Sequence, residues 1–234
     1  MTDRRHDPPG DEVARGEEPA ARLAGREPRG SRPAWLLAVL AVFLLAIAAI
    51  VGASLIRPDV PVFAATAPGV RDVPAGLAGP DTVTLDARAG EGWVGIDLAT
   101  LAVGDVRGMP AAWDIAAQRH RLIVNGGEGF LGGAGAVAAA GPYESVEVAP
   151  EAGYLQSRVT PNGDSIHAVF DDWYSYHFLS HLLEPVDRAY VVRTARGAYA
   201  KVRVLGYYCP GVEPGCVTLE FRYQGDGSRR LEAG

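Results

Sequence analysis

The sequence predicts an all-β, mainly antiparallel exported domain, a twisted sheet or meander, preceded by one transmembrane helix. Three observations lead to this prediction: an uncharged apolar run at 34–56, short β-rich runs with glycine-containing turns after residue 80, and two cysteines that bracket a turn near the C-terminus. Val, Ile, Thr and aromatic residues favour strands. An apolar run of about 20 residues is long enough for a helix to cross a bilayer.

Residues 1–33 contain seven arginines and seven acidic residues, with five prolines and little apolar material, so we expect a disordered cytoplasmic tail. Residues 34–56 are expected to be a retained signal-anchor helix with Trp35 at the membrane interface. The alternative is a cleaved signal peptide, whose apolar core is normally only about 7–15 residues long. A small-residue triplet at 65–67 resembles a cleavage site, but Pro68 follows it directly.

The arginines flanking the apolar run predict its orientation. Four precede it closely and two follow it: Arg22, Arg26, Arg29 and Arg32, then Arg57 and Arg71. By the positive-inside rule the N-terminus stays in the cytoplasm, and the C-terminal domain faces the periplasm or another extracytoplasmic space. From residue 57 onward the chain has 15 basic and 21 acidic residues, and this acidic balance argues against a nucleic-acid partner.

The rest of the chain divides into a Pro/Ala/Gly linker at 57–79, a β domain at 80–226 and a C-terminal tail at 227–234. The linker is expected to lift the domain off the membrane. The Gly/Ala stretch at 126–141 is expected to be a mobile loop, because it lacks the Lys-Ser/Thr of a phosphate-binding loop.

Five β-rich runs justify the strand prediction. Trp113 and Ile115 alternate with Asp114, which predicts a strand with both apolar side chains on one face. Residues 121–124 predict the next strand, which Asn-Gly-Gly at 125–127 ends because these residues accept positive φ. Residues 190–193 and 199–204 flank a short glycine-containing turn and predict a hairpin, and 216–223 predicts a third antiparallel strand beside it.

Cys209 and Cys216 bracket a Pro/Gly-rich turn between the last two predicted strands. In an exported domain we expect them to form a disulfide that closes this turn, stabilising the fold by about 2–3 kcal/mol on chain-entropy grounds. A two-cysteine metal site is the alternative, although no histidine lies in or beside the loop.

The blocks at 113–116 (Trp-Asp-Ile-Ala), 122–127 (Leu-Ile-Val-Asn-Gly-Gly) and 189–208 (from Ala-Tyr-Val-Val-Arg-Thr to Leu-Gly-Tyr-Tyr) resemble the HmuY-like family of secreted, all-β haem-binding proteins. The resemblance covers about residues 82–223. It implies haem as ligand, with iron held by two axial side chains, commonly histidines, from segments between the blocks. The chain departs from the family pattern at Ala117, where members usually carry an aromatic residue, and in lacking a lipid-attachment cysteine after the apolar run.

His167, His177 and His181 fall in that interval and are the predicted axial-ligand candidates, whereas His120 is expected on a sheet surface. His177 and His181 are four residues apart, so on one helix or one strand they would share a face. Because trans ligands approach iron from opposite sides, a bis-histidine site needs His167 opposed to one of the other two.

Aromatic residues crowd between these histidines and fit a flat apolar ligand, with arginine to pair its propionates. The predicted pocket residues are Phe170, Trp173, Tyr176 and Arg193, with Tyr174, Phe178 and Arg158 also considered. The alternative is that these aromatic residues form the core. Zinc held by His177 and His181 with Asp171 or Asp172 is a further hypothesis. We expect no enzyme, because His-Glu-x-x-His is absent and Ser180 lacks a nucleophile-elbow context.

Together these observations predict a membrane-tethered, envelope-exposed protein that captures or buffers haem and exchanges it with an envelope haem donor or acceptor protein. The alternative is an envelope protein-interaction domain that keeps the fold without binding haem, which Ala117 and the membrane tether both favour.

Overall fold

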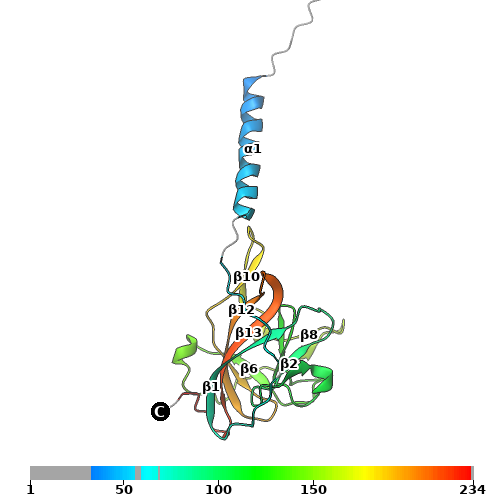
Figure 1. Cartoon of the computed structure of the whole chain (residues 1–234), viewed down its shortest axis with the longest axis vertical. Helices are drawn as coiled ribbons and strands as arrows, with labels where there is room; N and C mark the ends of the chain where they lie inside the picture. Colours follow the sequence, from blue (N-terminus) through cyan, green and yellow to red (C-terminus); the bar gives the residue numbers. More distant parts are fainter. Residues whose placement is uncertain (1–32, 56–58, 68, 233–234) are drawn as a thin grey trace, which may run out of the picture. The chain divides into compact units, whose positions relative to one another are not determined.

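The computed structural model describes residues 33–55, 59–67 and 69–232. It confirms an N-terminal apolar helix and a mainly antiparallel β domain (Figure 1). The elements are α1 (Ala34–Leu55), β1 (Leu77–Asp86), β2 (Val94–Ile96), β3 (Val103–Asp105), η1 (Val106–Gly108), β4 (Ile115–Gln118), β5 (Arg121–Val124), β6 (Gly135–Ala138), η2 (Tyr143–Ser145), β7 (Arg158–Val159), β8 (Ser165–Ile166), η3 (Ala168–Phe170), β9 (Tyr174–His177), β10 (Leu182–Pro185), β11 (Tyr190–Arg193), β12 (Tyr199–Cys209) and β13 (Glu213–Gln224).

Helix α1 has 22 residues, none of them charged and none buried. At 1.5 Å per residue it is about 33 Å long, enough to cross a hydrocarbon core of about 30 Å. It is the one helix of this length and composition among the described residues. The predicted tail at 1–33 lies outside the described residues apart from Pro33.

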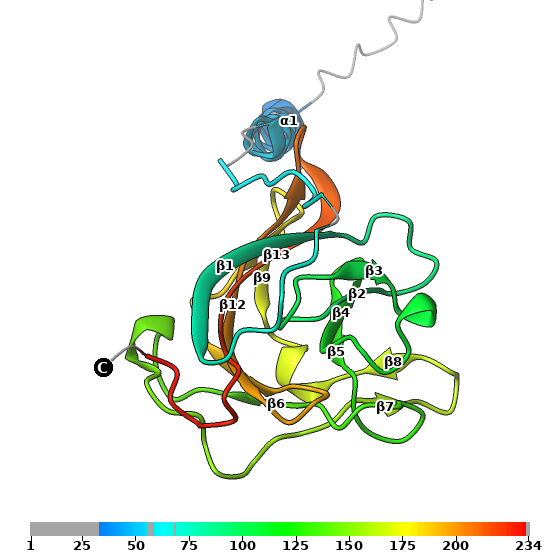
Figure 2. The ribbon, with the colours of Figure 1, turned by 60° about the horizontal axis from the view of Figure 1, so that its bottom comes forward.

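The β domain is built mainly from two facing sheets with the main core between them (Figure 2), and two short two-stranded sheets, β7-β8 and β9-β10, complete it. One sheet has the order β1-β13-β12-β11-β6 and the other β3-β2-β4-β5, with every neighbouring pair antiparallel. Core side chains come from both sheets: Leu85, Val192, Val202 and Leu219 from the first, and Ile96, Ile115, Ala117 and Val124 from the second. Ala117 is fully buried.

The far face of the five-stranded sheet is covered by the segment around η2 and by residues near the C-terminus. Along β11, Tyr190 and Val192 belong to the main core, whereas Val191 packs with Tyr143 and Leu231 on this second face. This alternation follows from the two-residue repeat of a strand, which sends successive side chains to opposite faces. Both faces of β11 are therefore buried.

A fully buried lysine lies on this second face. The ammonium of Lys201 in β12 donates to the carbonyls of Tyr143 and Val146, at 3.2 Å and 3.1 Å, and pairs with the carboxylate of Glu232. A buried charge is tolerated only when it is paired and hydrogen-bonded. The C-terminal residues, predicted to be a tail, thus hold the counter-charge of this lysine.

The predicted hairpin and third strand are confirmed. Tyr190 pairs with Val202 and Arg193 with Tyr199 across β11 and β12, and Gly197 takes φ of 86° in the turn. β13 lies beside β12 over nearly its whole length, as the run at 216–223 predicted. β5 ends at Val124, directly before the Asn-Gly-Gly sequence.

Two predictions about local structure were wrong. The strand begins at Ile115, and Trp113 lies before it, packed with Phe130 on the outer side of the small sheet while Ile115 faces the main core. The Gly/Ala stretch at 126–141 is not a loop throughout, because its second half forms edge strand β6 against β11. A glycine is required at the start of this stretch, since a Cβ on Gly126 would lie 1.8 Å from the carbonyl oxygen of Ala134.

The residues expected to form a linker pack on the domain over much of their length. Phe63 donates its N–H to the carbonyl of Tyr208 in β12 at 2.9 Å, and Thr66 exchanges hydrogen bonds with Thr84 in β1. Arg71 pairs with Asp81 at 2.7 Å and also bonds the carbonyl of Ala99. The chain therefore joins the domain by about residue 60, well before β1.

Candidate functional site

Two of the predicted ligands lie on a short hairpin that projects from the domain. β9 and β10 pair antiparallel, with His177 opposite Leu182 and Tyr174 opposite Pro185. The turn closes through the N–H of His181, which donates to the carbonyl of His177 at 2.8 Å, and His181 takes φ of 56°. Residues 178–181 form the tip of this structure, called the β9–β10 hairpin below.

His177 and His181 make separate sets of contacts. Nε2 of His177 lies 3.0 Å from the carboxylate of Glu184, whereas Nδ1 of His181 shares a hydrogen bond with the hydroxyl of Tyr176. Neighbours on a strand point to opposite faces, so His177 and Tyr176 are on opposite sides of the hairpin. The two histidines would share a face only if they lay on one continuous helix or strand. In the structure a turn separates His181 from the strand that ends at His177, so the spacing of four residues does not place them on one face.

The hairpin exposes an unusual amount of apolar surface. Phe178 is 77% exposed, Tyr176 54% and Leu179 53%. The ring of His181 lies 6.1 Å from that of Phe178 and 6.0 Å from that of Tyr176, so an imidazole sits among exposed aromatic rings. Contiguous exposed apolar side chains mark surfaces that bind something, whereas scattered single ones do not.

His167 occupies a different environment. It is 1% exposed and caps η3, where its Nδ1 accepts from the N–H of Val169 at 3.3 Å and its Nε2 donates to the carbonyl of Leu155 at 3.1 Å. Burial lowers the pKa of this imidazole, which favours its neutral form. Both ring nitrogens have partners within the protein, so His167 would have to give up one hydrogen bond to bind a metal.

The structure brings His167 together with His120 rather than with the hairpin histidines. Both line a cleft of about 200 Å³ together with Phe170, Asp171 and Tyr174. The ring of His120 meets that of Tyr174 edge to face at 5.7 Å. Pockets that hold drug-sized ligands are usually about 300–1,000 Å³, so this cleft does not enclose a porphyrin in the conformation described.

The predicted pocket aromatics fall into two groups. Phe170 and Trp173 are 3% and 1% exposed and belong to the main core, where the Trp173 indole donates to the carbonyl of His120 at 2.7 Å. Tyr176 is exposed on the hairpin. Arg193 bonds the carbonyl of Gly133 and lies over the ring of Tyr154, and Arg158 lies in β7.

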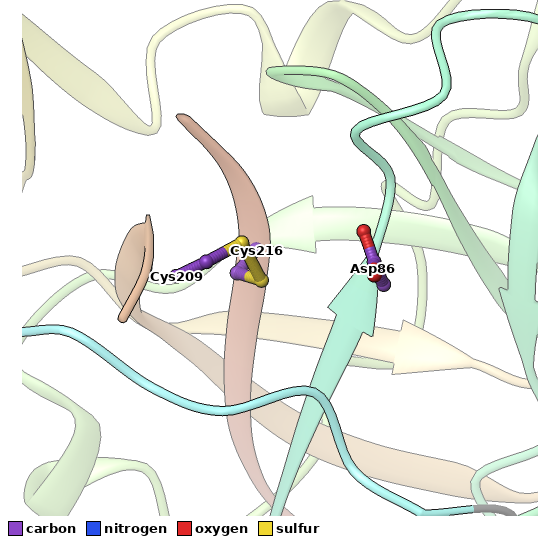
Figure 3. Close-up of side chains that lie close together, drawn as sticks. All are labelled: Asp86, Cys209 and Cys216. Carbon is purple, nitrogen blue, oxygen red and sulfur yellow. A yellow bond between two sulfur atoms is a disulfide. The ribbon is translucent and has the colours of Figure 1, made fainter. Parts of the chain in front are cut away.

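The two cysteines form the predicted disulfide, with an S–S distance of 2.07 Å, between the end of β12 and the start of β13. Asp86 lies beside them, and these three residues are the one cluster of potential metal-binding groups in the part of the chain that the structure describes (Figure 3). Disulfide sulfurs are not thiolates and do not supply a metal site. The hypothetical zinc ligands are not gathered: Asp172 pairs with Arg188 and His177 with Glu184.

Sequence reasoning missed a buried carboxyl in the first family block. Asp114 is 3% exposed and accepts two backbone N–H groups, from Leu98 at 2.9 Å and from Ala195 at 2.7 Å. It thereby joins the small sheet to the β11–β12 turn. Burial raises the pKa of Asp114 to about 7, with nearby Asp97 acting in the same direction. The alternation of apolar residues at Trp113 and Ile115 drew attention to these two side chains and did not indicate that Asp114 between them is buried and hydrogen-bonded.

The structure is thus an antiparallel β domain with two accessible imidazoles on an exposed aromatic hairpin. The match to known proteins agrees: the model of the family described as HmuY protein matches residues 89–223. The chain belongs to the HmuY family, whose members bind haem. A comparison with curated proteins gives no match.

Solved structures share the fold at low sequence identity. A protein from Bacteroides vulgatus designated HmuY-like and haem-binding is 18% identical, with a TM-score of 0.50, and the match covers 66% of this chain and 97% of that one. A protein from Bacteroides fragilis designated a lipoprotein is 17% identical with a TM-score of 0.52, covering 69% and 97%. The apo form of a HmuY analogue from Tannerella forsythia is 16% identical with a TM-score of 0.50, covering 66% and 99%.

Proposed function

We propose that this protein is a membrane-tethered, haem-binding protein of the cell envelope, a binding protein rather than an enzyme. Family membership supports haem as the ligand. The observation that carries the proposal for this chain is the β9–β10 hairpin, where His181 lies between the exposed rings of Tyr176 and Phe178. A flat, apolar porphyrin is the kind of ligand that such a surface fits.

Of the three predicted ligands, the two on the hairpin are the more accessible. His177 and His181 each have one ring nitrogen engaged by a neighbouring side chain, which leaves the other for a metal. Neutral imidazole is a common iron ligand in haem proteins. We propose His181 as the first axial ligand. His167 would supply the second only after releasing the carbonyl of Leu155 and after the hairpin had moved towards its cleft.

The anchor is the second part of the proposal. Helix α1 has the length and composition of a membrane span, and the arginine excess before it favours a cytoplasmic N-terminus and an extracytoplasmic β domain. The disulfide fits an oxidising compartment, because such bonds are rare where thiols are kept reduced. An envelope protein that donates or accepts haem would be the natural partner.

Haemin titration of the full chain in detergent, followed by absorbance, tests the proposal. We expect a sharp low-spin Soret band that saturates at one equivalent and is lost in His181→Ala. His167→Gln keeps a side-chain donor for the carbonyl of Leu155 and reports on the second ligand. His6→Ala changes a histidine outside the β domain and is the matched control. A weak, broad change that no histidine substitution alters would refute haem binding.

Two observations favour the second candidate function, an envelope protein-interaction domain without haem. Both ring nitrogens of His167 are satisfied inside the protein, and Ala117 is buried in the core where family members usually carry an aromatic residue. If the titration gives only a weak, broad change that no histidine substitution alters, the protein-interaction function is the one that remains.

A further inference from the structure

The chain between α1 and the β domain is short. Helix α1 ends at Leu55, and Val60 already packs on the main core. Five residues span at most about 17 Å when fully extended, at 3.3–3.6 Å per residue. Phe63 and Thr66 then hold the following residues on β12 and β1. If α1 spans a bilayer, the part of the domain around Val60 is within about 17 Å of the end of the span.

The β9–β10 hairpin projects from the same end of the domain. Val60 and Pro61 line a cleft of about 350 Å³ together with Pro185 and Val186, which lie at the base of the hairpin. Leu183 in β10 donates its N–H to the hydroxyl of Tyr208, the residue whose carbonyl binds Phe63. Figure 1 shows the hairpin that contains β10 extending away from the body of the domain.

The length of the hairpin matches the length of the connection. Four residues of β9 at about 3.3 Å each give an arm of about 13 Å, and the tip lies beyond it. The side chains at the tip, Phe178 and Leu179, are 77% and 53% exposed. Aromatic and aliphatic side chains of this kind are stabilised where headgroups meet acyl chains.

We propose that the tip of the β9–β10 hairpin, Phe178 and Leu179, docks on the outer surface of the bilayer in which α1 is anchored. The inference rests on the membrane anchor proposed above but not on haem binding. The domain then has two attachments to the membrane, the covalent one at Leu55 and the apolar one at the hairpin. The histidines of the hairpin lie at the lipid surface, where apolar ligands dissolved in the bilayer are within reach.

The attraction to lipid is apolar rather than electrostatic. The side chains around the base of the hairpin include Asp59, Glu184 and Asp187 with Arg188 and Arg203, so this end of the domain offers no excess of positive charge. Anionic lipids bind polybasic surfaces, and this surface is not one. Docking is therefore expected in zwitterionic phosphatidylcholine and should be insensitive to salt.

The test uses the full chain in phosphatidylcholine nanodiscs whose acyl chains carry bromine, which quenches indole fluorescence on contact. The parent chain, Phe178→Trp and Leu131→Trp are compared. Leu131 is a matched control because it is 75% exposed and precedes Gly132, which lies beside Ala195 in the turn before β12, whereas Tyr208 lies at the other end of that strand. We expect the indole added at 178 to be strongly quenched and that added at 131 to be unaffected.

Each outcome is informative. Equal emission from the two added indoles, in nanodiscs where Trp35 of the parent chain is quenched, would overturn the docking while leaving the anchor in place. An unquenched Trp35 would overturn the anchor and the docking with it. Haem absorbance of the same samples reports separately on ligand binding.

Discussion

Asp114 should give this domain a measurable loss of stability as the pH rises. Its carboxylate is buried between two backbone N–H donors, with Asp97, Arg196 and Tyr223 close enough to affect titration. Its pKa is raised to about 7 from 3.8. The native state therefore keeps a proton that the unfolded chain releases near pH 4.

The sign and size of the effect follow from linkage. Where the native state binds more protons than the unfolded state, the free energy of unfolding falls as the pH rises. Asp114 therefore contributes stability that is fully present below about pH 4 and is lost as the pH rises to about 7. A difference of about three pKa units corresponds to about 4 kcal/mol, or about 1.4 kcal/mol per pH unit within the window.

The assay compares the full chain with Asp114→Asn by chemical unfolding in detergent from pH 4 to pH 8.5, followed by tryptophan fluorescence. Asparagine does not titrate, so the difference in unfolding free energy between the two chains isolates this carboxyl. This matters because His167 acts in the opposite direction: its pKa is lowered, so acidification below about 6.5 destabilises the native state. A difference that stays constant across the range would refute the titration of Asp114 near neutrality.

Three further outcomes are expected. Replacing Cys209 and Cys216 together by serine should lower the unfolding free energy, because the disulfide no longer restricts the unfolded chain. The loss should be only about 2–3 kcal/mol, since the closed loop is short, and denaturant titration measures it. An unchanged midpoint would contradict this. Trp173→Phe keeps a buried ring but leaves a carbonyl at the β4–β5 turn without its donor, and should cost about 1–3 kcal/mol in the same assay. Gly206→Val should loosen the segment after α1, because a Cβ at this position would lie 2.7 Å from the ring of Phe63; faster proteolysis between residues 59 and 67 would show it.

Gly108→Val is the matched control for the last prediction. A Cβ at Gly108 meets no atom within 4 Å, so the same change in side chain should leave the proteolysis rate unchanged. Equal rates in the two variants would refute the role of Gly206.

Most of the fold was predictable because its signals are local. The β11–β12 hairpin and β13 follow from β-branched runs and a glycine turn, and the disulfide follows from two cysteines beside that turn. Edge strand β6 was not predictable from composition. Its glycines and alanines have weak strand propensity, and the pairing with β11 together with tight packing against the segment at 154–155 decides their conformation.

The candidate site was predictable only as a set of residues. The position of His177 and His181 between the family blocks made them ligand candidates. The sequence could not indicate the turn that separates them, because a tight turn at a histidine with positive φ has no strong sequence signal. Burial of His167 and exposure of Phe178 depend on contacts with segments distant in sequence. Which histidines bind haem stays a prediction.

The way the ends of the domain are closed has a consequence for where the folding unit begins and ends. The family match stops at 223, yet Lys201 inside it has its carboxylate partner at Glu232, and β13 has its outer neighbour in β1, before residue 89. A chain trimmed to the matched segment would leave the buried ammonium of Lys201 without its carboxylate partner and would expose the edge of β13 that β1 covers. The packed domain is therefore larger than the segment by which the family is recognised, and its contacts extend from about residue 59 to residue 232.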